Sequence, residues 1–102
     1  MKVKINISNL SSVIDLRVDN STDKCTFNGK VIDIDTKDFV KRLQFIVASW
    51  ELNMIDNSII DGERYSVTMV LDDKVREYVG INKFPLNYGQ FKDLVYEVVD
   101  NH

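Results

Sequence analysis

The stretch that decides the fold runs from residue 60 to residue 91 and reads IDGERYSVTMVLDDKVREYVGINKFPLNYGQF. From Tyr65 onward apolar and polar residues alternate, which is the period of a half-buried strand. A polar triplet at 72–74 then predicts a turn, and a second strand follows until Pro85, which cannot donate to a strand ladder. The stretch therefore predicts an antiparallel hairpin. In its second strand, side chains alternate between two faces. The alternate residues counted from Val75 and those counted from Arg76 are both candidates for the inward face.

A helix is predicted after Pro85. Asn87 followed by Gln90 resembles a capping box, in which two polar side chains satisfy backbone N–H groups at a helix start. The apolar stripe predicted for this helix is Phe91, Leu94, Val95 and Val98, flanked by Tyr88 and Val99.

The N-terminal third of the chain predicts four further strands. Residues 3–7 and 14–18 alternate with the strand period, and Asn28-Gly29 is a strong signal for a two-residue hairpin turn. Such a turn places Cys25 opposite Ile32. The residues then expected on the buried face are Cys25, Phe27, Ile32 and Ile34.

From Asp35 or Thr36 the period becomes helical, with an apolar stripe of Phe39, Val40, Leu43, Ile46, Val47 and Trp50. Residues 53–62 carry two turn signals, Asp56-Asn57 and Asp61-Gly62, and are interpreted as a connection that has room for a short strand. The sequence thus predicts a single α+β domain over residues 1–102. Its expected elements are four strands, a helix, two strands and a helix, forming an antiparallel sheet of about six strands with both helices on one face.

Charge and composition exclude several classes of function. The net charge is −3, and no segment concentrates Lys and Arg, so duplex nucleic acid and anionic membranes should attract the chain poorly. The longest apolar runs are far short of the ~20 residues that cross a bilayer, and the N-terminus alternates like a strand rather than forming a signal peptide. With one cysteine, no intramolecular disulfide can form. We expect a cytoplasmic protein that binds neither nucleic acid nor membrane.

The side chains that carry catalysis elsewhere have ordinary structural explanations here. His102 is the last residue, and Cys25 occupies an inward strand position with no neighbouring histidine. The aspartate pairs at 33/35 and 72/73 match turn and cap chemistry better than any metal-ligand spacing, and the glycines form no phosphate-binding fingerprint. We predict no catalytic residue, no metal and no cofactor.

Arginines of the hairpin are expected to form ion pairs across it. Arg64 and Arg76 lie on the two strands, and Glu63 and Glu77 are the acidic partners available to them.

An apolar strip lies opposite the main stripe of the first helix. It consists of Phe45, Ala48 and Leu52, and a solvated helix face would not normally carry it. Either the connection at 53–62 folds over it, or it is a surface for a partner or for self-association. Tyr78 and Tyr96 add amphipathic aromatic rings of the kind found in interfaces.

Several residues of the opening stretch form a recurring pattern. Asp61-Gly62 is followed by Tyr65, and Gly80, Asn82, Phe84-Pro85 and Asn87-Tyr88 then lead into the helix. This resembles an element of small uncharacterised bacterial proteins, a DG-x-x-aromatic hairpin followed by G-x-N-x-aromatic-P-x-N-aromatic. The resemblance covers about a third of the chain and implies no particular activity.

These observations favour a non-enzymatic protein-binding module, which includes the case of a homo-oligomer. One specific version is an immunity-type protein that neutralises a toxin, which small size and acidity would suit. The alternative class is a small-ligand binder or enzyme whose site forms only in three dimensions.

Overall fold

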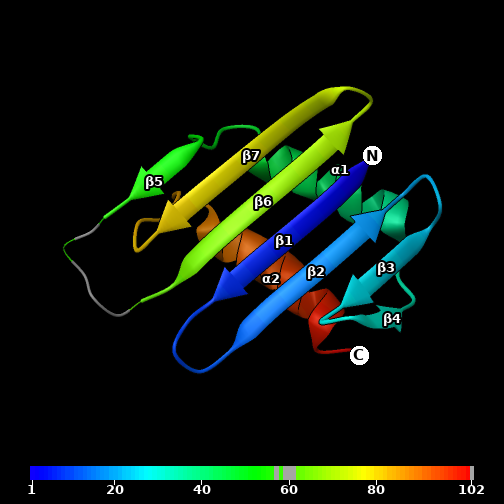
Figure 1. Ribbon diagram of the computed structural model, residues 1–102, viewed down its shortest axis with the longest axis horizontal. Helices are drawn as coiled ribbons and strands as arrows, with labels where there is room; N and C mark the ends of the chain where they lie inside the picture. Colours follow the sequence, from blue (N-terminus) through cyan, green and yellow to red (C-terminus); the bar gives the residue numbers. More distant parts are fainter. Residues whose placement is uncertain (57, 59–61, 102) are drawn as a thin grey trace.

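The computed structural model of the protein describes residues 1–56, 58 and 62–101. These residues form seven strands and two helices, drawn in Figure 1. In chain order they are β1 (Lys2–Ser8), β2 (Val13–Asp19), β3 (Lys24–Phe27), β4 (Lys30–Ile32), α1 (Thr36–Val47), β5 (Asn53–Ile55), β6 (Arg64–Leu71), β7 (Lys74–Ile81) and α2 (Tyr88–Val99). The predicted α+β class is confirmed. The expectations for His102 and for the turns at Asp56-Asn57 and Asp61-Gly62 fall wholly or partly on residues 57, 59–61 and 102, which lie outside the described residues.

The strands form one sheet in the order β4-β3-β2-β1-β6-β7-β5. Every neighbouring pair is antiparallel except β5 and β7, which run parallel. The expected antiparallel sheet of about six strands is therefore corrected to a mixed sheet of seven. The extra strand is β5, which lies in the predicted connection: after α1 the chain returns to the sheet edge, where the Leu52 carbonyl accepts the Val79 N–H at 2.9 Å.

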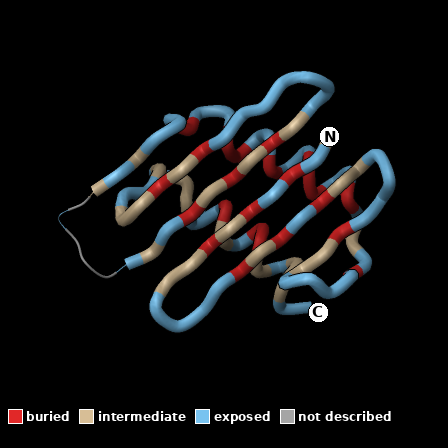
Figure 2. The backbone as a smooth tube through the Cα atoms, viewed as in Figure 1, coloured by how far each residue is buried: buried red, intermediate tan, exposed pale blue. Residues whose placement is uncertain are grey.

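Both helices lie on the same face of the sheet, as predicted (Figure 1). Along the central strands, buried and exposed residues alternate (Figure 2), because successive side chains point to opposite faces. The predicted stripes of the two helices supply the other half of the core. Their buried members are Phe39, Val40, Leu43, Ile46, Val47, Trp50, Phe91, Leu94 and Val95.

The inward face of β7 is the one that contains Tyr78 and Gly80. Tyr65 of β6 lies directly opposite Gly80, and its ring occupies the space that a side chain at position 80 would need. A Cβ atom placed on Gly80 would lie 1.9 Å from Tyr65 Cε1. The absent side chain thus leaves room for a buried tyrosine ring against the neighbouring strand.

The two-residue turn at Asn28-Gly29 is confirmed. Both residues have positive φ, 49° and 83°, and Cys25 pairs with Ile32 as expected. Of the residues expected on this buried face, Cys25 and Ile32 are buried, whereas Phe27 and Ile34 are partly buried against the core. The turn between β6 and β7 likewise has two residues, and Asp72 adopts a φ of 53° there.

The helix starts were placed correctly, but only one of the two predicted caps forms. Asp35 precedes α1, and its side chain accepts the Asp38 N–H at 3.1 Å. Asn87 precedes α2, but its side chain makes no capping bond, so the predicted capping box is wrong. Instead Asn87 accepts the Trp50 indole N–H at 2.6 Å and donates to the Ile46 carbonyl at 2.8 Å. The Asn87 amide therefore forms hydrogen bonds with a buried indole and with one of the carbonyl groups that have no intrahelical partner at the end of α1.

Candidate functional site

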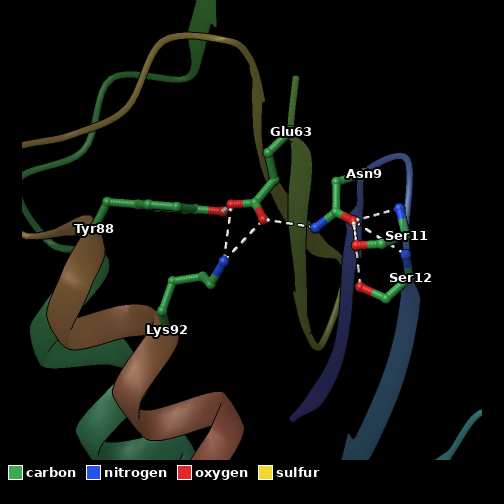
Figure 3. Close-up of polar contacts among 6 residues, drawn as sticks. All are labelled: Asn9, Ser11, Ser12, Glu63, Tyr88 and Lys92. Atoms are coloured by element: carbon green, nitrogen blue, oxygen red, sulfur yellow. Dashed lines mark hydrogen bonds and ion pairs between the residues drawn. The ribbon is translucent and has the colours of Figure 1, made fainter. Parts of the chain in front are cut away.

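A polar cluster joins the end of the sheet to α2 (Figure 3). At its centre, the carboxylate of Glu63 accepts the Tyr88 hydroxyl at 2.5 Å and the Lys92 ammonium at 2.8 and 3.1 Å. The Asn9 amide donates to the same carboxylate at 3.2 Å, while its own oxygen accepts from Ser11 and Ser12 in the turn between β1 and β2. The cluster therefore ties together three segments that are far apart in the sequence.

The electrostatics of this cluster keep both of its acidic groups in their ordinary charge states. Burial opposes the charged form of Glu63, but the bonds from Lys92, Tyr88 and Asn9 outweigh it, so the pKa of the carboxyl is lowered. Burial, followed by the adjacent Glu63, raises the pKa of the Tyr88 phenol. At neutral pH a carboxylate is thus held by a protonated phenol and an ammonium, an arrangement that stabilises the fold.

Sequence reasoning missed this cluster and assigned Glu63 a different partner. Glu63 pairs with Lys92 at 2.8 Å, and Glu77 accepts from Thr68 at 3.1 Å. Among the described residues, the ion pairs expected from Arg64 and Arg76 to these two carboxylates do not form. The available signal was the spacing of Tyr88 and Lys92, which puts both side chains on one helix face.

Cys25 and the aspartates occupy structural positions. Cys25 is 2% exposed, and burial raises the pKa of its thiol to about 11, which keeps the sulfur protonated and unreactive. Asp35 caps α1, and Asp72 forms the hairpin turn. Within the described part of the chain, no group of three or more His, Cys, Asp or Glu side chains could hold a metal ion.

The apolar strip of α1 is open to solvent. Phe45 is 84% exposed and Leu52 is 49% exposed, and Ala48, directly after the helix, is also exposed. Within the described part of the connection that follows, β5 runs along the edge of β7, and the described residues leave Phe45 exposed.

Two grooves flank this strip. The first lies between α1 and α2, has a volume of about 820 Å³, and is lined by Arg42, Phe45, Ile46, Gln90, Asp93 and Leu94. The second lies between α1 and the β6–β7 hairpin, has a volume of about 540 Å³, and includes Val47, Ala48, Met69, Lys74, Arg76 and Tyr78 in its walls. Gln44 lines both grooves, so the exposed face of α1 forms the ridge between them.

The structure brings some of the predicted interface residues together and separates others. Phe45, Ala48 and Leu52 follow one another along the ridge and the chain that leaves it. Tyr78 is 2% exposed, so it forms part of the wall of the second groove rather than an exposed contact. Tyr96 lies on α2, partly buried against the core, with the Lys92 ammonium 5.3 Å from its ring centre.

Comparison of the chain with protein-family models, with curated proteins and with solved structures finds no significant match. Neither α1 nor α2, the helices found in the described ranges, is long and apolar enough to span a bilayer.

Proposed function

We propose that this protein is a non-enzymatic protein-binding module whose contact surface is centred on Phe45. The observation that carries the proposal is the 84% exposure of this phenylalanine on a ridge between two grooves. Burying such a side chain against a partner contributes roughly 1.5–3 kcal/mol, and aromatic residues beside apolar pockets often dominate binding energies. Ala48 and Leu52 extend the same surface.

The charge of the chain supports a cytoplasmic protein partner over nucleic acid or membrane. A net charge of −3 gives no long-range attraction to phosphate groups. The resemblance of the hairpin and α2 to small bacterial proteins belongs to the same proposal, and it adds no activity of its own.

The test compares two aspartate substitutions at equally exposed apolar positions. Phe45→Asp removes the proposed contact, and Leu10→Asp is the matched control, because Leu10 is 83% exposed in the turn between β1 and β2. Each tagged variant is used to recover partners from an extract of the source organism, and light scattering measures its mass. We expect a partner, or self-association, that Phe45→Asp abolishes and Leu10→Asp preserves. A monomer whose recovered proteins are the same for both variants would refute the proposal.

A further inference from the structure

Over residues 74–78 the outer edge of β7 has no neighbouring strand among the described residues. β7 runs from Lys74 to Ile81, but β5 pairs only with Val79, Gly80 and Ile81. The first half of β7 therefore ends the sheet on that side (Figure 1), as far as the described residues extend. Such an edge is a template for another strand, and proteins usually shield it.

The register shows which backbone groups face this edge. Leu71 and Lys74 close a two-residue hairpin and so exchange hydrogen bonds, and from there bonded and non-bonded pairs alternate. The N–H and C=O groups of Val75 and Glu77 consequently point away from β6. The next outward residue, Val79, follows the same rule, since its N–H reaches Leu52. Among the residues that the structure describes, none pairs with the outward backbone groups of Val75 or Glu77.

The groove between α1 and the hairpin runs beside this open edge, and the charged side chains that line it are all cationic. Its apolar wall includes Ala48, Met69 and Tyr78, whereas Lys74 and Arg76 are its charged lining residues. In the described part of the chain neither cation forms an ion pair, and Arg76 donates a long hydrogen bond to the Tyr78 hydroxyl at 3.5 Å. An acidic side chain entering this groove would meet two cations without displacing an existing carboxylate.

We propose that the partner contributes an extended segment that adds to the sheet beside Val75 and Glu77. Its backbone pairs with the outward N–H and C=O groups, as in other cases of strand addition. Its groove-facing side chains are acidic near Lys74 and Arg76 and apolar near Ala48. Its outward side chains are apolar and cover Val75, which is 66% exposed. This inference deepens the proposed function and rests on it, because the groove borders the ridge that carries Phe45.

The probe is a labelled heptapeptide of the pattern Val-Glu-Val-Glu-Val-Leu-Val, whose binding is measured by fluorescence anisotropy. Its two glutamates are two residues apart, as Lys74 and Arg76 are on β7. A peptide with lysine in place of both glutamates tests the charge. We expect the acidic peptide to bind at least about tenfold tighter, because close like charges oppose binding. Equal binding of the two peptides would overturn the predicted acidic character of the partner.

Two changes test the backbone pairing. Val75→Pro removes an N–H that faces the open edge and leaves the ladder to β6 intact, and Val75→Thr is the control that keeps the N–H. We expect Val75→Pro to weaken peptide binding about tenfold or more and Val75→Thr to change it by less than about twofold. If Val75→Pro does not fold, N-methylation of the peptide amides that face β7 tests the same hydrogen bonds from the other side. Unchanged binding by the N-methylated peptide, or by a folded Val75→Pro variant, would overturn strand addition.

The outcomes separate this inference from the proposed function. If Phe45→Asp loses the cellular partner and Val75→Pro retains it, the proposed binding function is supported and the proposed strand addition is wrong. If neither variant loses the partner, both proposals fail. If light scattering shows a dimer of the protein that Val75→Pro dissociates, the occupant is a second copy and the proposed partner class is wrong.

Discussion

The side-chain oxygen of Asn87 accepts the indole N–H of Trp50 at 2.6 Å, across a separation of 37 residues. Through this bond and the bond from its amide nitrogen to the Ile46 carbonyl, Asn87 joins the start of α2 to the end of α1. The indole ring packs edge-on against Phe91 with ring centres 5.1 Å apart, so the bond also orients a buried aromatic cluster.

Asn87→Ala should destabilise the fold by about 1–3 kcal/mol, because it leaves the buried indole N–H without its acceptor. Gln90→Ala is the control, since Gln90 would matter only if the capping box formed, and it should change the free energy of unfolding by less than about 0.5 kcal/mol. Urea denaturation followed by tryptophan fluorescence measures both. A larger loss for Gln90→Ala than for Asn87→Ala would contradict the observed role of Asn87.

Gly80→Ala should cost about 1–3 kcal/mol, because the new methyl group would overlap the ring of Tyr65 and force it from the core. Gly89→Ala is the matched control. Gly89 lies in the first turn of α2, and an added Cβ there has no neighbour within 4 Å, so alanine should be neutral or stabilise the helix by up to about 1 kcal/mol. The melting temperatures of the two variants should shift in opposite directions or by clearly different amounts. Equal shifts would argue against the close approach of Tyr65 to Gly80.

Glu63 should make stability depend on pH in the acid range. Its pKa is lowered in the folded state, so the folded protein binds fewer protons than the unfolded chain as the carboxyl titrates. The stabilisation it provides is complete above its ordinary pKa of 4.5 and is lost as the pH falls through the lowered folded value. Glu63→Gln should therefore lose less stability than the wild type between pH 7 and pH 3.

The control for this pH dependence is Glu97→Gln. Glu97 also has a lowered pKa, through its bond with Arg42, but both side chains are about half exposed and the pair should contribute little. Its acid profile should follow that of the wild type. Parallel profiles for Glu63→Gln and the wild type would show that the polar cluster is not a source of acid sensitivity.

Cys25 should resist thiol reagents while the protein is folded. Its sulfur is buried, and the raised pKa leaves almost no thiolate at pH 8. Reaction with a chromogenic disulfide should be slow in buffer and rapid in concentrated urea. Fast labelling of the native protein would mean that β3 and β4 open easily at the sheet edge.

Local signals were sufficient for most of the elements. Alternation located β1, β2, β6 and β7, because a strand with one buried face repeats every two residues. The turn at Asn28-Gly29 was predicted from two residues that tolerate positive φ, and the apolar stripes identified both helices. The exposed strip at Phe45 was also visible, since it contradicts the polarity expected of an outer helix face.

What the sequence by itself determined is thus the set of elements and the faces that their periods define. Only the tertiary structure decided that a three-residue segment becomes β5, that Gly80 faces inward against Tyr65, and that Glu63 meets Lys92. It also decided that β5 stops short and leaves Val75 at an open edge beside a groove. The physical reason is range: propensity and periodicity act between near neighbours, whereas these contacts join segments whose meeting depends on how the whole sheet and both helices pack.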